Sequence, residues 1–187
     1  MGIKCIKKID DDIRQKLKQF LPFGKFSEIN SAVLNRSAAK SLMYPTNDFH
    51  LYEDQFSAVK AMLSPGEDLF LLQMGFNDGF YSNLNDIYIC DSNLSYTEYE
   101  EIWLDSISVI ASSSWEWIVL VDEAYEGGLG VFTSNHKAVS RFDSIYGKTT
   151  SDMVAFVEYF IKRTKKMDHS LEYMMDILSL CKDKTES

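Results

Sequence analysis

Carboxylates near residue 122 are the side chains whose types and spacing could carry out acid–base chemistry. Asp122, Glu123 and Glu126 flank Tyr125, just before a pair of glycines. Two neighbouring carboxylates can divide the roles of general acid and general base when their surroundings separate their pKa values. A small carboxylate-dependent hydrolase is therefore one interpretation of these residues, and a surface that binds another protein is the other.

Sequence motifs of the common enzyme classes are missing from the 187 residues. There is no Walker loop, no nucleophile elbow and no HExxH motif. The glycine cluster at 127–130 lacks a following helix that could hold a phosphate, so we expect a hairpin turn there. Cys90 follows an apolar run and precedes Asp91, which favours a raised thiol pKa over a reactive thiolate. We therefore predict that the protein is not an enzyme and has no catalytic residue.

Metal and cofactor sites are not predicted either. The histidines His50, His136 and His169 have no His, Cys or Asp at ligand spacing, so surface or capping roles are expected for them. Three cysteines without close spacing indicate a reducing compartment. Asp and Asn alternate around Asp78 in a way that suggests calcium, but the pattern misses the terminal Glu of a calcium loop. We expect neither a metal nor a cofactor.

The distribution of charge along the chain is more informative than its total. The chain has 19 basic and 28 acidic residues and a formal net charge of -9. Residues 61–136 contain thirteen Asp and Glu and no Lys or Arg. The same block holds all three tryptophans and is too apolar for disorder, so we expect it to fold. A folded negative surface attracts a basic partner and repels nucleic acid, although acidity can also serve solubility alone.

The elements that would position these residues form one α+β domain spanning 1–187. Helical spacing and helix-start signals predict helices near 11–21, 27–40, 54–63 and 96–111, another after Thr149, and a final one from Leu171 to Cys181. Short apolar runs predict strands at 69–76, 87–90, 116–121 and 129–133. We expect an antiparallel sheet of about four strands packed with helices, with the last two strands forming a hairpin.

The helix predicted over 96–111 would have an aromatic inner side and an acidic outer side. Glu98, Glu101 and Asp105 recur at helical spacing on the outer side. Trp103 and Trp117 are expected in the core. The longest apolar runs are far shorter than the roughly 20 residues that cross a bilayer, and the first residues are charged. We therefore predict a soluble, cytoplasmic protein with no membrane partner.

The stretch from Ser114 to Gly128, in which a Trp-bearing strand leads into an acidic Gly-Gly hairpin, resembles the small acidic immunity proteins of bacterial toxin systems, including those of contact-dependent growth inhibition. The resemblance lies in overall character: a strongly acidic single domain without a catalytic motif. It implies that the protein binds a cognate toxin domain, often a basic nuclease, and blocks its active site or substrate surface. A nucleic-acid-mimicking or adaptor protein for another basic partner is the alternative.

The expected interface combines carboxylates with aromatic anchors, because exposed ion pairs alone contribute only about 0–1 kcal/mol each. The predicted anchors are Phe80, Tyr81 and Tyr125. The predicted charged surround is Asp78, Glu98, Glu101, Asp105, Asp122, Glu123 and Glu126.

Overall fold

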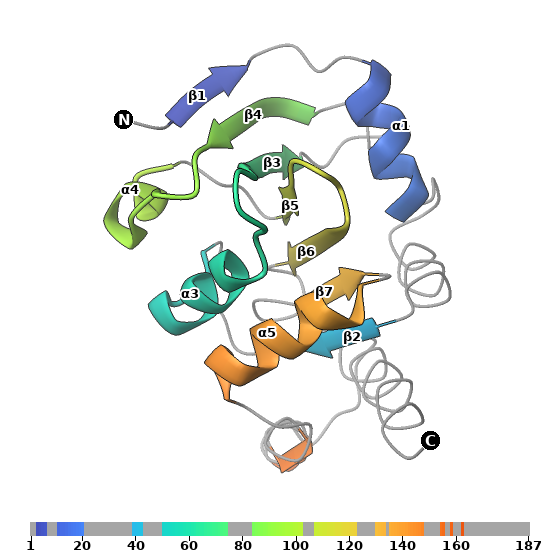
Figure 1. Ribbon diagram of the computed structural model, residues 1–187, viewed down its shortest axis with the longest axis vertical. Helices are drawn as coiled ribbons and strands as arrows, with labels where there is room; N and C mark the ends of the chain where they lie inside the picture. Colours follow the sequence, from blue (N-terminus) through green and yellow to red (C-terminus); the bar gives the residue numbers. More distant parts are fainter. Residues whose placement is uncertain are drawn as a thin grey trace.

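A seven-stranded antiparallel sheet runs through the part of the chain that the structure describes (Figure 1). The computed structural model describes residues 3–6, 11–20, 39–42, 50–74, 84–102, 107–122, 130–133 and 135–147, and single helical residues at 154, 155, 158 and 162. The strands are β1 (Ile3–Ile6), β2 (Ala39–Leu42), β3 (Leu69–Met74), β4 (Leu84–Cys90), β5 (Ile107–Ser112), β6 (Trp117–Asp122) and β7 (Gly130–Thr133). Their order in the sheet is β1-β4-β3-β5-β6-β7-β2. The predicted α+β class is confirmed, and the sheet is larger than the four strands expected.

Four helices have described ranges: α1 (Asp11–Phe20), α3 (Glu53–Ala61), α4 (Tyr96–Glu100) and α5 (His136–Tyr146). The first two agree with the sequence prediction. The turn after α3 contains Gly66 at φ +84°, a left-handed conformation that favours glycine. No helix among the described residues is long and apolar enough to cross a membrane.

The hairpin predicted for the last two strands is confirmed, since β6 pairs antiparallel with β7 from Trp117 opposite Thr133 to Leu120 opposite Gly130. The strands predicted at 69–76 and 87–90 appear as β3 and β4. Strands β1, β2 and β5 and helix α5 were not predicted. Gly127 and Gly128 of the predicted turn lie outside the described residues.

The helix predicted over 96–111 is wrong beyond its first turn. Helix α4 ends at Glu100, and β5 occupies 107–112 in the centre of the sheet, between β3 and β6. Val109 and Ile110 point to opposite faces of the sheet and are both fully buried. A strand buried on both faces has a continuous apolar run rather than alternation, and such a run also contains residues at helical spacing. Glu98 and Glu101 therefore do not belong to one face of a long helix.

The helix predicted over 27–40 is wrong at its end, because Ala39 and Lys40 belong to β2, which pairs with β7. Residues 21–38 lie outside the described part. The helix predicted after Thr149 is represented by the helical residues 154, 155, 158 and 162. The final helix, from Leu171 to Cys181, lies outside the described residues, as does Trp103.

Helices α3 and α5 lie side by side against one face of the sheet (Figure 1). The cluster between them and the sheet joins Phe56 and Val59 of α3 to Phe142 of α5. The strand residues of this cluster recur at every second position, as Leu69 and Leu71 do in β3, because alternate side chains share one face. Trp117 belongs to the same cluster and is 1% exposed, as predicted.

Asn135 connects α5 to the β5–β6 turn. Its side-chain oxygen accepts hydrogen bonds from the backbone N–H groups of Lys137 (3.0 Å) and Ala138 (3.3 Å), which caps the helix. Its Nδ2 donates to Oε2 of Glu116, in the turn, at 2.8 Å.

Replacing Asn135 with alanine should therefore lower the free energy of unfolding by about 1–2 kcal/mol, since a helix cap and a bridging hydrogen bond are both lost. Asn135→Asp is the matched control. It keeps the capping oxygen and replaces the donor to Glu116 with a second carboxylate, so we expect a smaller loss. Urea unfolding followed by circular dichroism measures both, and an Asn135→Ala variant as stable as the unmodified chain would contradict the expectation.

Candidate functional site

Three residues of the predicted interface are described, and they lie at two opposite ends of the sheet. Asp122 ends β6 opposite Ile107, the first residue of β5. Cys90 aligns with the last residue of β5, Ser112, because both pair with Leu69. Five residue steps along β5 correspond to about 17 Å, so Asp122 lies at the other end of the sheet from Cys90.

Glu98 lies at the Cys90 end of the sheet, since its charge acts on the Cys90 thiol. The structure therefore does not bring Asp122 together with Glu98, and the two belong to separate surfaces. Glu101 caps the C-terminus of α4, close to Glu98. Seven other predicted interface residues lie outside the described part: Asp78, Phe80, Tyr81, Asp105, Glu123, Tyr125 and Glu126.

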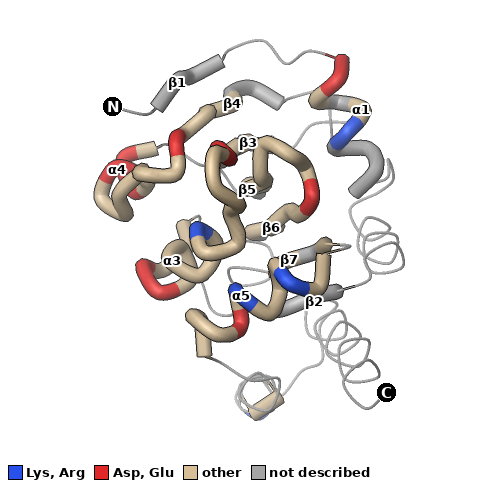
Figure 2. The backbone as a smooth tube through the Cα atoms, in the orientation of Figure 1, with Lys and Arg blue, Asp and Glu red and all other residues tan. Residues whose placement is uncertain are grey.

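Acidic residues lie on and around α4 (Figure 2). Five of them are exposed and two are half-buried. They come from the first turn of α3, the start of β3, the end of β4, and α4 with its cap. We call this set the acidic α4 surface, and its members are Glu53, Asp54, Asp68, Asp91, Glu98, Glu100 and Glu101.

The charges of three members of the acidic α4 surface act on the buried thiol of Cys90. Burial, followed by the carboxylates of Asp91, Asp68 and Glu98, raises the pKa of Cys90 to about 12. The raised thiol pKa predicted from the sequence is confirmed. Residues 68, 91 and 98 thus share one neighbourhood, because the strand pairing of β3 with β4 brings the start of one beside the end of the other.

Ser95 holds Glu98 in its ionised form. The Ser95 hydroxyl accepts a hydrogen bond from the backbone N–H of Glu98 at 3.2 Å, and Oε2 of Glu98 accepts from the backbone N–H (2.8 Å) and the hydroxyl (2.7 Å) of Ser95. This reciprocal pair is a capping box that begins α4. The hydrogen bonds from Ser95 lower the pKa of Glu98. A carboxylate held in its charged form suits electrostatic binding better than proton transfer.

Cations do not neutralise this surface within the described part of the chain. The charge of Lys60 acts on Glu98, but its Nζ donates to the Leu94 carbonyl oxygen at 2.6 Å and lies 5.7 Å from the centre of the Phe56 ring. Among the described side chains, Lys16 and Asp12 form an ion pair on α1, away from α4. Among the side chains that the structure describes, seven carboxylates with one lysine beside them give a strongly negative local field.

Tyr96 and the start of α3 extend the site beyond what the sequence predicted. The Tyr96 hydroxyl donates to the carbonyl oxygen of Leu51 at 3.1 Å, which joins α4 to the residues before α3. Burial, followed by Glu100 and Glu53, raises the pKa of Tyr96 to about 12. Glu53 and Asp54 precede the cation-free block, so charge counting missed them. The start of α4 at residue 96 agrees with the sequence prediction, and the Ser95-x-x-Glu98 spacing is a further local signal for it.

The histidines differ in their surroundings. His136 is exposed at the first position of α5, as expected for a surface residue. His50 is half-buried instead, with Nε2 at 2.9 Å from the Ile102 carbonyl oxygen and its ring edge-on to Tyr99 at 5.3 Å. It connects the chain before α3 to the end of α4, a structural role that its sequence neighbours do not indicate. His169 lies outside the described residues.

Across the described residues, no group of three or more His, Cys, Asp or Glu side chains is arranged to hold a metal ion. Comparisons of the chain with protein-family models, curated protein sequences and solved structures find no match. The function must therefore be argued from the acidic α4 surface itself.

Proposed function

We propose that this protein binds a basic protein through the acidic α4 surface and acts as an immunity protein that neutralises a cognate toxin domain, with a basic nuclease as the partner class. The observation that carries the proposal is the set of seven carboxylates around α4, of which five are exposed and none forms an ion pair within the described residues. The resemblance of the 114–128 stretch to immunity proteins gives the partner class.

A nuclease suits such a surface for a physical reason. Its substrate-binding groove must present Lys and Arg to phosphates. An inhibitor that offers carboxylates can occupy the same groove and exclude the nucleic acid. Electrostatic steering raises association rates to about 10⁸–10⁹ M⁻¹s⁻¹ at low salt, and rapid capture matters for a toxin that must be stopped before it acts.

Several features support binding through charge at this place. Glu98 is held ionised by Ser95, and α4 is fixed to the core through Tyr99, which is fully buried. A rigid arrangement of charges lowers the entropic cost of association. An inhibitor that works by occlusion needs no catalytic group, so this proposal does not depend on a pair of carboxylates that divide acid and base roles.

A charge-matched pair of variants tests the proposal. Glu98→Gln, Glu100→Gln and Glu101→Gln together remove three charges from the acidic α4 surface. Asp11→Asn, Asp12→Asn and Glu158→Gln together remove three exposed charges from elsewhere. The partner is isolated from the native host with the unmodified chain, and association is followed by stopped flow at low and physiological ionic strength.

We expect the α4 triple variant to associate at least about tenfold more slowly at low ionic strength, with a weaker salt dependence. The control variant should change the rate by less than about twofold, and the partner should lose nuclease activity when the unmodified chain is bound. Equal slowing by both variants would show that net charge alone acts. A basic partner without nuclease activity would favour the adaptor or nucleic-acid-mimic alternative.

A further inference from the structure

Tyr52 is a large hydrophobic side chain that stays exposed beside the acidic α4 surface. Among the described residues, Tyr52 at 43% and Ile145 at 53% are the large hydrophobic side chains with exposed surfaces. The backbone of Tyr52 is fixed, because its N–H donates to Oε1 of Gln55 at 2.8 Å while Nε2 of Gln55 donates to the hydroxyl of Tyr146 at 3.2 Å. The ring of Tyr52 is thus exposed on an ordered backbone.

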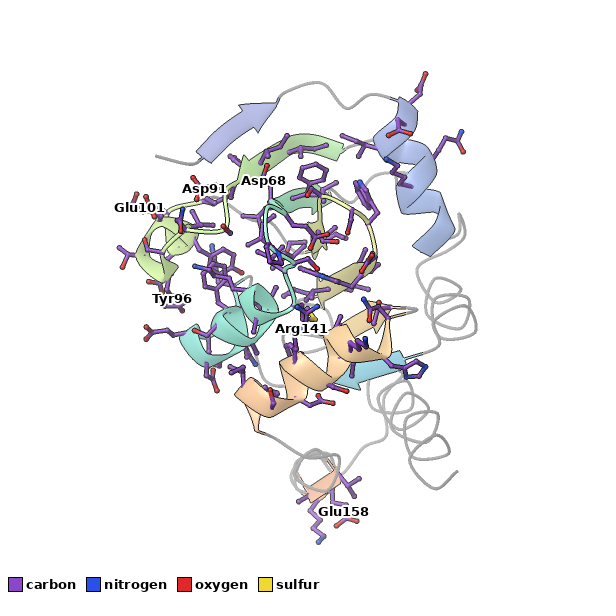
Figure 3. The ribbon with its side chains drawn as sticks, in the orientation of Figure 1. Asp68, Asp91, Tyr96, Glu101, Arg141 and Glu158 are labelled. Atoms are coloured by element: carbon purple, nitrogen blue, oxygen red, sulfur yellow. The ribbon has the colours of Figure 1, made fainter. Side chains whose placement is uncertain are left out.

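Tyr96 and two carboxylates lie around Tyr52. Figure 3 shows Tyr96 at the N-terminal end of α3, where Tyr52 and Glu53 begin the helix. The ring of Tyr96 lies 6.0 Å from that of Phe56, which anchors it to α3. The Tyr96 hydroxyl donates to the carbonyl oxygen of the residue before Tyr52 at 3.1 Å, and Glu100 follows Tyr96 by one helical turn in α4, on the same face of the helix. Tyr52, Glu53 and Glu100 also contribute to the raised pKa of Tyr96. Two tyrosines and two glutamates therefore lie where α4 packs against the start of α3.

We propose that Tyr52, together with Glu53 and Glu100, receives an arginine side chain of the basic partner. This inference rests on the proposed function and names the contact that would dominate it. A guanidinium group is planar and weakly hydrated, so it can stack on a tyrosine ring while donating paired hydrogen bonds to a carboxylate. An ammonium group is compact and strongly hydrated, and it gains less from the ring.

Charge complementarity selects this occupant over an apolar one. Glu53 and Asp54 follow Tyr52 directly, and Glu100 belongs to the adjacent helix α4. An apolar segment placed on Tyr52 would therefore strip water from carboxylates that form no ion pair among the described residues. An arginine satisfies those carboxylates as it covers the ring. Tyr and Arg are also the residues that most often dominate the affinity of protein interfaces.

Short oligo-arginine and oligo-lysine peptides of equal length are suitable probes, since they match in charge and differ in the cationic group. Titration of the full chain is followed by nuclear magnetic resonance at low ionic strength. We expect the arginine peptide to bind more tightly and to shift the backbone amides of Tyr52, Glu53 and Glu100. Tyr52→Ala should weaken arginine binding about two- to fivefold and leave lysine binding unchanged, while Tyr52→Phe should keep the preference.

Two further variants separate the possible failures. Ile145→Ala removes the other exposed hydrophobic side chain, and we expect no change in peptide binding. A loss equal to that of Tyr52→Ala would point to apolar docking and overturn the arginine site, as would a Tyr52→Ala variant that keeps the full preference. If only the α4 triple variant weakens both peptides, the arginine site fails and the acidic binding surface stands. If neither peptide binds the unmodified chain, both proposals fail.

Discussion

Replacing Tyr99 with alanine is expected to lower the free energy of unfolding by about 3–5 kcal/mol, as for other large aromatic residues in protein cores. The ring of Tyr99 is fully buried and stacks on Phe56, with ring centres 4.5 Å apart and an angle of 13° between planes. Its hydroxyl accepts a hydrogen bond from the backbone N–H of Leu51 at 3.0 Å. Helix α4 has only five residues and has little stability of its own, so its position depends on this side chain.

Two controls separate packing from hydrogen bonding and from charge. Tyr99→Phe keeps the stacked ring and leaves the buried Leu51 N–H without its acceptor, so we expect a loss of about 1–3 kcal/mol. Glu101→Gln, on the exposed cap of the same helix, should change stability by less than about 0.5 kcal/mol. Urea unfolding measures all three. If Tyr99→Ala cost no more than Glu101→Gln, then α4 would not be held by its buried ring.

Alkaline pH should destabilise the protein strongly, because buried groups of the core keep their protons above their ordinary pKa values. Burial and neighbouring carboxylates raise the pKa of Cys90 from 9.0 to about 12, and burial raises the pKa of Tyr99 above its ordinary 10.0. The unfolded chain releases these protons near pH 9 and 10, while the folded chain retains them. The folded state then binds more protons, so its stability falls by about 1.4 kcal/mol per pH unit for each group.

The stabilising contribution of these two groups is fully present below pH 9 and declines as pH rises towards 12. We expect a combined loss of about 4 kcal/mol between pH 8 and pH 11, a large share of the stability of an ordinary domain. Cys90→Ala should make the loss between pH 8 and pH 11 smaller by about 2.7 kcal/mol, which is the part due to the thiol. Urea unfolding at a series of pH values provides the measurement, and an unchanged slope in Cys90→Ala would contradict the assignment.

The sequence predicted elements best where local signals and tertiary surroundings agree. An acidic first turn identified α1, and a proline-glycine turn identified the end of α3. Strand β5 was missed because both of its faces are buried, so Val109 and Ile110 show no alternation. Strand β2, with the sequence Ala-Lys-Ser-Leu, has no β-branched residue, and its pairing with β7 decides its conformation.

The sequence predicted that the candidate site is acidic, but it did not predict which carboxylates lie close together. Counting charges located the acidic block, yet the carboxylates of that block divide between the two ends of the sheet. Asp122 and Glu98 are separated because β5, an unexpected strand, reverses the chain between them. Tyr52 and Glu53 join the site because α4 packs against the start of α3, through contacts such as the hydrogen bond from the Tyr96 hydroxyl to Leu51 across 45 residues, which no spacing rule could reveal.

The two edge strands of the described sheet, β1 and β2, precede their partners in the chain: β1 pairs with β4, and β2 pairs with β7. During synthesis at about 5–20 residues per second, the partner of each edge strand leaves the ribosome several seconds after the edge strand itself. Its unpaired backbone is meanwhile open to other nascent chains. Lys4 and Lys40 lie within these two strands, and charge on such strands is a common natural protection against premature self-association.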